Sequence, residues 1–275
     1  MLHLLTLTYN GLDRLTKLYK SLIPALGNTS YTWHIKDNGS KDDTVETVKS
    51  WEGNIRVVAY KDNRQNFAEG MNYIFHDAAP ADNDLVMMLN NDVIFNDTTS
   101  ITNMTEIIRK DPKVGAVGAR LLYTDSNLLQ HAGVVFDKTY NTPMHFRARQ
   151  PTDENAEKNR LFQVVTGAVL VTRASNYRNV CKKNKSGLVG MDENFHWAFD
   201  DVDLCLSINY HQKQKIVYCG NTNIFHEESA SLKKNPVNKL FLNHNLMYLF
   251  DKWQKTYVID GDIYVKDTKH NLYRG

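Results

Sequence analysis

The sequence predicts an α/β protein with a mostly parallel central sheet and helices on both faces of that sheet. In the first hundred residues, four short apolar runs alternate with stretches in which apolar residues recur at helical spacing. The run over residues 85–89 has no polar residue, which indicates a strand buried on both faces. The chain has no internal repeat or low-complexity tract. We therefore expect one continuous domain over residues 1–257 and a C-terminal tail over residues 258–275.

The first half of the chain follows a regular strand–helix order. Strands are expected over residues 2–8, 31–36, 55–60 and 85–89. The helices between them have apolar stripes over residues 12–22, ended by Pro24, and over residues 44–51 and 67–78. This rhythm is typical of a parallel sheet covered by helices.

The second half has longer and less regular connections. Strands are predicted over residues 114–123, 130–136, 162–172, 216–219 and 224–226. Residues 141–160 are polar and without periodicity, which favours a surface loop. A long amphipathic helix carries Leu240, Phe241, Met247, Phe250 and Trp253, and the segment from Asp260 onwards is expected to form a small hairpin or a loose tail.

Bulk composition excludes several classes of protein. The net charge is +2 and the pI is near 8.3, so no global field attracts nucleic acid or an anionic membrane. The three cysteines have no CxxC spacing, which favours a reduced compartment over a disulfide framework or a zinc site. No apolar stretch approaches the ~20 residues that span a bilayer, and no secretory leader is recognisable. We therefore expect a cytoplasmic protein without a transmembrane segment.

Polar residues follow three of the predicted strands at their carboxyl ends: Thr8-Tyr9-Asn10, Asp37-Asn38 and Asn90-Asn91-Asp92. Open parallel sheets bind ligands at this edge. The chain has neither GxGxxG after its first strand nor GxxxxGK[ST], so we expect neither an NAD-type site nor a Walker loop. Asp37 is instead predicted to accept hydrogen bonds from a nucleotide base or ribose, with Asn10 and the backbone at Thr8 around the base. An ordinary turn at Asp37 is the alternative.

Two carboxylate clusters point to metal binding and to acid–base chemistry. Asp92, directly after a buried strand, is well placed to hold Mg²⁺ or Mn²⁺ against a diphosphate, although an Asx turn is the alternative. Asp200, Asp201 and Asp203 crowd the start of a predicted helix, and adjacent carboxylates raise each other's pKa, as a general base near neutral pH requires. An acidic first turn that complements the helix dipole is the alternative.

Taken in order, these motifs resemble family 2 glycosyltransferases with the GT-A fold, in particular their rhamnosyltransferase-like branch. The resemblance covers roughly residues 2–230 and rests on the following segments: Thr8-Tyr9-Asn10, Asp37-Asn38-Gly39-Ser40, Asn66 to Asn72, Leu89-Asn90-Asn91-Asp92-Val93, Thr166-Gly167-Ala168 with Arg173, and Asp192 to Phe195 followed by Asp200 to Cys205. It implies a nucleotide-sugar half over residues 1–97 and an acceptor half over residues 98–257 with a smaller antiparallel region.

The resemblance also implies roles for individual residues. Asp201 would be the catalytic base with Asp200 beside it, and Asp92 with His226 would hold Mn²⁺ or Mg²⁺. His196 and Trp197 would contact the acceptor, although core packing is the alternative for both. The implied donor-binding residues are Thr8, Tyr9, Asn10, Asp37, Asn38, Asn66, Asn90, Asn91, Gly167 and Ala168.

The implied reaction is an inverting, metal-dependent transfer of a sugar from a UDP-, dTDP- or GDP-linked donor to a hydroxyl of a glycan or lipid-linked saccharide. Transfer onto hydroxymethylated DNA bases is an alternative. A non-catalytic glycan- or nucleic-acid-binding protein on a decayed scaffold is another. A sugar-1-phosphate nucleotidylyltransferase would need a glycine-rich phosphate loop with a basic residue after the first strand, which residues 8–12 do not provide.

Overall fold

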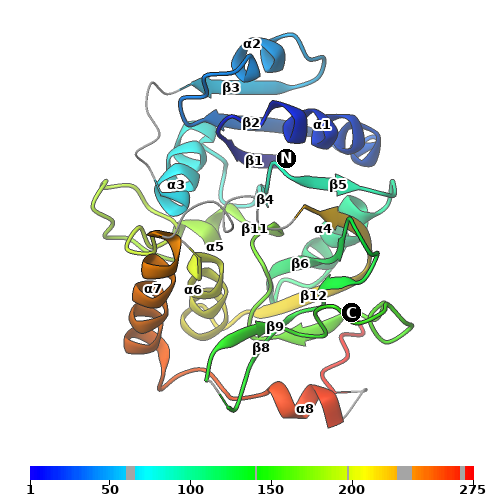
Figure 1. Cartoon of the computed structure of the whole chain (residues 1–275), viewed down its shortest axis with the longest axis vertical. Coiled ribbons are helices and arrows are strands. Elements are labelled where there is room, and N and C mark those ends of the chain that lie inside the picture. The colour runs from blue at the N-terminus through cyan, green and yellow to red at the C-terminus, as the bar shows by residue number, and fades with distance from the viewer. Residues whose placement is uncertain (60–65, 140, 197, 228–236, 267–269) are drawn as a thin grey trace.

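The structure is a computed structural model, and it describes residues 1–59, 66–139, 141–196, 198–227, 237–266 and 270–275. Its first half has the predicted alternation of strands and helices (Figure 1). The strands are β1 (Leu2–Thr8), β2 (Tyr31–Asp37), β3 (Ile55–Ala59) and β4 (Leu85–Leu89), and the helices are α1 (Leu12–Leu26), α2 (Thr44–Lys49) and α3 (Phe67–Ala78). The four strands pair in the parallel order β4-β1-β2-β3.

The second half extends the same sheet. Its strands are β5 (Val93–Phe95), β6 (Val114–Tyr123), β7 (Leu129–His131), β8 (Val134–Phe136), β9 (Pro143–His145), β10 (Arg160–Phe162), β11 (Val169–Arg173) and β12 (Lys215–His226). Its helices are α4 (Ser100–Lys110), α5 (Ala174–Arg178), α6 (Asp200–Leu206), which continues as the π-helical η1 (Ser207–His211), α7 (Val237–Trp253) and α8 (Gly261–Lys266).

Ten strands of the described residues form one sheet in the order β10-β12-β6-β11-β4-β1-β2-β3, with β5 on β12 and β7 on β6. β11 runs antiparallel to both β4 and β6, so β6 and its parallel partner β12 point in the same direction as the first four strands. β8 and β9 form a separate antiparallel pair. The prediction of a mostly parallel sheet with a smaller antiparallel region is confirmed.

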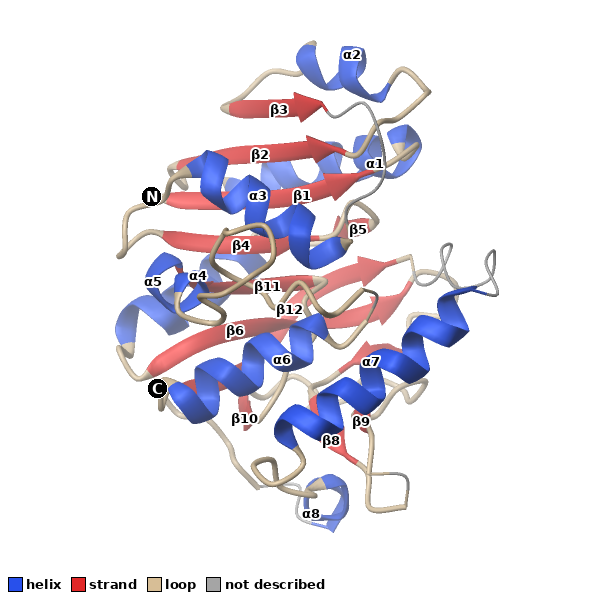
Figure 2. Ribbon diagram, turned by 90° about the vertical axis from the view of Figure 1, so that its left-hand side faces the viewer, coloured by secondary structure: helices blue, strands red, loops and turns tan. Residues whose placement is uncertain are grey.

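Helices cover both faces of the sheet, as Figure 2 shows, and each face has its own core. Along β4, Val86 and Met88 belong to the core beneath α3, α6 and α7, whereas Leu85, Met87 and Leu89 belong to the core beneath α1 and α4. This alternation follows from the period of two in a strand. Because all five side chains are buried, the strand is apolar throughout.

Several elements differ from the sequence prediction. The two strands expected over residues 216–219 and 224–226 are one strand, β12, whose polar residues 220–223 lie at a register irregularity against β6. α1 continues past Pro24 to Leu26, although proline has no N–H to donate to the carbonyl four residues earlier. The polar segment 141–160 contains β9, and the segment expected to be a hairpin or loose tail contains α8 with a buried Tyr264.

Candidate active site

The carboxyl ends of β1 and β2 are joined by a network of side-chain and backbone hydrogen bonds. Asp37 is 1% exposed, and its Oδ2 accepts from the backbone N–H groups of Gly39 and Ser40 at 3.0 and 2.8 Å. The Ser40 hydroxyl donates to the other carboxylate oxygen. Asp37 therefore shapes the turn after β2, as the turn alternative proposed. Its predicted contact with a nucleotide stays a prediction.

Asn10 and Asn91 tie the neighbouring segments to this turn. The N–H of Asn10 donates to Ser40 Oγ at 2.7 Å, and Asn10 Oδ1 accepts from Lys41 N at 2.8 Å. Asn91 Nδ2 donates to Thr8 Oγ1 at 3.1 Å. A Cβ on Gly11 would lie 2.8 Å from Asn91 Nδ2 and 2.9 Å from Thr8 Oγ1, so a larger residue there would push apart the two side chains that bond each other. This edge is a fixed scaffold beside a surface hollow that Gly11 helps to line.

The two residues predicted to bind metal face each other across neighbouring strands. β5 pairs antiparallel with the end of β12, with His226 opposite Val93, and Glu227 N donates to Asp92 O at 2.9 Å. This pairing places His226 Nε2 3.1 Å from Asp92 Oδ1. That carboxylate oxygen is buried and accepts no hydrogen bond within the described part of the chain.

The protonation pattern of His226 favours a cation between these atoms. Gln130 Oε1 lies 2.7 Å from His226 Nδ1, while Gln130 Nε2 donates to His226 O at 3.3 Å, which fixes the orientation of the amide. Because an amide oxygen only accepts, Nδ1 carries a ring proton. When the ring is neutral, the lone pair of Nε2 faces Asp92 Oδ1 and, at 3.4 Å, the side-chain amide nitrogen of Asn90. Two electron-rich atoms, Nε2 and Asp92 Oδ1, therefore face each other.

The 3.1 Å separation suits two ligands of one ion, because atoms that bind Mg²⁺ at about 2.1 Å and at right angles lie about 3 Å apart. Among the described residues, no group of three or more His, Cys, Asp or Glu side chains could hold a metal by itself. The residues present thus fit a divalent cation that takes its remaining ligands from a substrate diphosphate and water.

Asp201 lies in the first turn of α6, and its carboxylate is held by the segment that precedes β11. Gly167 N donates to Asp201 Oδ2 at 2.8 Å, and Val202 N donates to Oδ1 at 2.8 Å. A Cβ on Gly167 would lie 2.9 Å from Asp201 Cβ, so this approach requires glycine. The next residue, Ala168, accepts from Asn90 N at 2.9 Å. The Gly167–Ala168 segment thereby connects Asp201 to the end of β4, where the turn that contains Asp92 begins.

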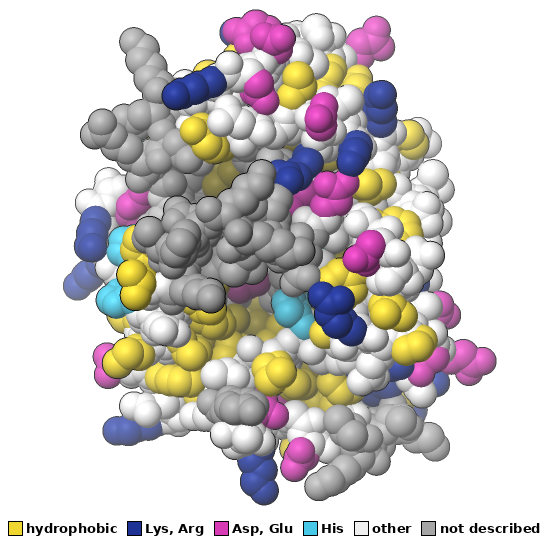
Figure 3. Space-filling model, viewed as in Figure 1, with side chains coloured by type: hydrophobic (Ala, Val, Ile, Leu, Met, Phe, Trp, Pro, Cys, Tyr) yellow, Lys and Arg dark blue, Asp and Glu magenta, His cyan; other side chains and the backbone are white. Residues whose placement is uncertain are grey.

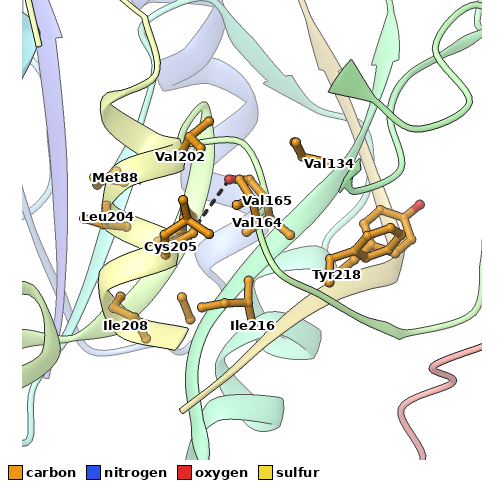
Figure 4. Close-up of a cluster of buried hydrophobic side chains, with 14 of the residues drawn as sticks. Met88, Val134, Val164, Val165, Val202, Leu204, Cys205, Ile208, Ile216 and Tyr218 are labelled. Carbon is orange, nitrogen blue, oxygen red and sulfur yellow. Dashed lines mark hydrogen bonds between the residues drawn. The ribbon is translucent and has the colours of Figure 1, made fainter. Parts of the chain in front are cut away.

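Packing fixes α6 against the same segment (Figure 4). Val165 lies against the helix, and the Cys205 thiol donates to its carbonyl at 3.4 Å. Ala198 and Phe199, directly before α6, have φ angles of 64° and 65°, in the left-handed region. Such strain costs about 1–3 kcal/mol per residue and persists only where the surrounding structure holds it. The strained turn sets the direction from which α6 presents Asp201.

The other two carboxylates of the cluster have different environments. Asp200 is buried, and burial together with the neighbouring Asp201 carboxylate raises the pKa of Asp200 to about 7. Asp203 is buried against α7, where it accepts from Trp253 Nε1 at 2.6 Å and lies 2.7 Å from Lys252 Nζ. Burial raises the pKa of Asp203, while Lys252 opposes that shift. Asp203 therefore anchors α7 and is not available for catalysis.

His196, one of the two predicted acceptor-side residues, lies beside α7. His196 is exposed, with its ring centroid 5.6 Å from that of Phe241 and 6.3 Å from that of His244. Figure 3 shows histidines and apolar side chains gathered on the left of the molecule, over α7. Trp197 lies outside the described residues. Asn66 caps α3, where it forms a capping box with Glu69.

The model of the glycosyl transferase family 2 matches residues 4–176. The chain belongs to glycosyl transferase family 2. A search of curated proteins found no match. The matched residues include all three strand-end clusters of the first half and the Gly167 segment, whereas Asp201 and His226 lie beyond them.

Solved structures of similar fold include other GT-A glycosyltransferases. GalNAc-T7 with UDP, GalNAc and Mn²⁺ matches with a TM-score of 0.64 and 12% identity, over 100% of this chain and 52% of that chain. The mannosyltransferase PcManGT from Pyrobaculum calidifontis, in complex with GDP-Man and Mn²⁺, gives 0.62 and 12%, over 96% and 69%. TarS of S. aureus gives 0.55 and 13%, over 82% of this chain and 60% of that chain. The GT-A fold of this family 2 chain is thus established.

The family 2 site contains residues that the sequence did not reveal. Gly11 lies against Asn91 and Gln130 contacts His226, and both partners are far away in the sequence. No local sequence pattern therefore predicts that these two residues belong to the site. Lys36 is 1% exposed, and its ammonium donates to Asn38 Oδ1, beneath the Asp37 turn. Burial lowers the pKa of Lys36 to about 8. A lysine inside a predicted strand, directly before Asp37, was the one available signal for this residue.

Proposed function

We propose that this family 2 protein is an inverting glycosyltransferase that moves a sugar from a nucleotide-diphosphate donor to an acceptor hydroxyl and depends on Mn²⁺ or Mg²⁺. One observation carries the proposal: a buried carboxylate oxygen of Asp92, which accepts no hydrogen bond among the described residues, lies 3.1 Å from Nε2 of His226, and the Gly167–Ala168 segment connects that strand end to the carboxylate of Asp201. A metal-facing pair and a held carboxylate are the two parts that this reaction needs.

In the proposed reaction, the acceptor hydroxyl gives its proton to Asp201 while its oxygen attacks the anomeric carbon from the face opposite the diphosphate. A new carbon–oxygen bond forms as the bond to the diphosphate breaks, through a transition state of oxocarbenium character. The Gly167 N–H keeps Asp201 Oδ2 in place. Asp200, whose pKa is about 7, remains largely protonated below that pH and so adds little negative charge next to the base. When bound, the metal ion offsets the charge on the departing diphosphate.

The donor is proposed to be a UDP-, dTDP- or GDP-linked sugar, bound along the edge formed by Thr8, Asn10 and Asp37. For the acceptor we propose a saccharide hydroxyl, because exposed rings at His196 and Phe241 suit stacking on a sugar. A reducing, cytoplasmic compartment agrees with the three free thiols of Cys181, Cys205 and Cys219. No helix of the described residues is long and apolar enough to cross a membrane.

The test is a donor-hydrolysis screen with UDP-, dTDP- and GDP-sugars in the presence of Mn²⁺, Mg²⁺ or EDTA. The quantity measured is the release of free nucleotide. Release from one donor that stops in EDTA is expected. Asp92→Asn and Asp201→Asn should each abolish transfer, whereas Asp125→Asn, at an exposed turn, should not change it. NMR of the product should show the anomeric configuration opposite to that of the donor. Donor binding that persists without any turnover would instead favour a binding protein.

A further inference from the structure

The short strand β7 contains two consecutive polar residues that reach both parts of the site. Its Gln130 contacts His226, and its His131 contacts the segment that holds Asp201. Successive side chains of a strand point to opposite faces of the sheet, so one strand can serve two separate segments. Both side chains are buried, at 4% and 0% exposed.

Gln130 controls which nitrogen of His226 carries the ring proton. Its amide makes two contacts with the same residue, accepting from Nδ1 at 2.7 Å and donating to the carbonyl at 3.3 Å. The second contact prevents the amide from turning over. If Gln130 could not accept, the ring proton could move to Nε2, which would remove the lone pair that faces Asp92 Oδ1.

His131 holds the other segment. Thr166 N donates to His131 Nε2 at 3.3 Å, and the next residue, Gly167, donates to Asp201 Oδ2 at 2.8 Å. Because a backbone N–H only donates, His131 Nε2 is an acceptor and its proton lies on Nδ1, which is 2.8 Å from His145 Nδ1. Burial lowers the pKa of His131 well below its ordinary value, so the ring stays neutral and keeps this acceptor.

We propose that Gln130 and His131 are paired positioning residues: Gln130 directs the metal-facing nitrogen of His226, and His131 fixes the Thr166–Gly167 segment against Asp201. This inference rests on the proposed function. Neither residue touches the reacting atoms, and each acts through one neighbour. The two therefore differ in what they change: Gln130 sets the affinity for metal, and His131 sets turnover.

The first experiment measures the Kd of Mn²⁺ in the presence of UDP by calorimetry, which requires no acceptor and no turnover. Gln130→Leu should raise this Kd about 10- to 100-fold, the usual effect of losing a partner that orients a metal ligand. Gln130→Glu keeps an acceptor oxygen and should stay within about threefold of the wild type by the same reasoning. The matched control is Gln150→Leu, the same change at an exposed glutamine that has no contact with His226.

Asp92→Asn separates failure of this inference from failure of the proposed function. If Asp92→Asn loses Mn²⁺ binding while Gln130→Leu binds as the wild type does, the role of Gln130 is wrong and the metal site stands. If Asp92→Asn also binds as the wild type does, the metal site itself is wrong, and the inference about Gln130 is lost with it.

The second experiment measures kcat, KM and the Mn²⁺ Kd of His131 variants. His131→Gln places an amide oxygen near the position of Nε2, whereas His131→Asn reaches only the position of Nδ1. We expect His131→Asn and His131→Leu to lose about tenfold or more in kcat with an unchanged Mn²⁺ Kd, and His131→Gln to recover most of it. The Gln and Asn variants decide the matter even if the Leu variant does not fold. Equal kcat for the Gln and Asn variants would overturn the role of His131.

Discussion

Replacing Gly167 with alanine places a methyl group against the proposed base. The added Cβ would lie 2.9 Å from Asp201 Cβ, 3.5 Å from Met88 Cε and 3.7 Å from Asp201 Oδ2. Carbon atoms in contact prefer about 3.5–4.0 Å, so Asp201 has to move by roughly 0.6 Å or more. Because a misplacement of about 1 Å can cost a hundredfold in rate, we expect kcat to fall about 10- to 100-fold.

The metal side of the site should be unaffected by this change. Asp92 and His226 do not contact Gly167, so the affinity for Mn²⁺ with UDP should stay within about threefold of the wild type. Removing a residue that orients a metal ligand costs about 10- to 100-fold in metal affinity, which is a much larger loss. The assay combines nucleotide release, for kcat, with calorimetry, for the metal Kd, on the donor that supports turnover. A loss in kcat alone would place the effect on Asp201.

Gly70→Ala is the matched control. Its Cβ would meet Leu7 Cδ1 at 2.8 Å, a similar overlap, but in α3 and against the flexible end of a side chain. Alanine also gains about 1 kcal/mol of helix propensity over glycine. We expect Gly70→Ala to change the melting temperature without changing kcat. If Gly167→Ala folds and keeps its kcat within about twofold of the wild type, the assignment of Asp201 as the base is refuted.

Three further changes test separate parts of the fold. The pKa of Asp200 is raised from its ordinary 3.8 to about 7, so the folded chain holds a proton that the unfolded chain releases, and the free energy of unfolding should fall between pH 4 and 7. Urea unfolding across that window should show Asp200→Asn gaining stability over the wild type as the pH rises, and parallel curves would contradict the shift. Lys252→Met leaves the buried carboxylate of Asp203 without its cation and should cost about 3 kcal/mol in urea unfolding, while Lys255→Met, at an exposed position, should cost almost nothing. Asn66→Ala removes the cap of α3 and should lower the free energy of unfolding by about 1 kcal/mol, whereas Asn66→Ser should stay close to the wild type. If calorimetric melting shows the same loss of stability for both variants, the capping role is wrong.

The first half of the fold could be predicted because its signals are local. A run such as Leu85–Leu89 is apolar at every position, since both faces of its strand are covered. β5 escaped prediction because it has three residues directly after the Asp92 turn and pairs with β12, which lies far along the chain. Residues 220–223 look like a turn in the sequence. In the structure they belong to β12, where its register against β6 is irregular.

The candidate site divides in the same way. Asp92 and Asp201 could be found because a carboxylate at a strand end or in the first turn of a helix is visible in the sequence. The contribution of Gly167 to Asp201 depends on a 2.8 Å contact between residues far apart in the chain. Gln130 lies in the three-residue strand β7, and only the structure shows that it faces His226.

The pairing of β5 with β12 has a consequence for folding kinetics. The two proposed metal ligands lie far apart in the chain and meet only where β12 pairs with β5. We expect this long-range contact to form late in folding, because the loop-closure entropy must be paid before such a contact forms. A cation can therefore bind only the completed fold, and it stabilises the native state by mass action. Contacts absent from the transition state slow unfolding and leave the refolding rate unchanged. Added Mn²⁺ with UDP should accordingly lengthen the lifetime of the folded chain without speeding its formation.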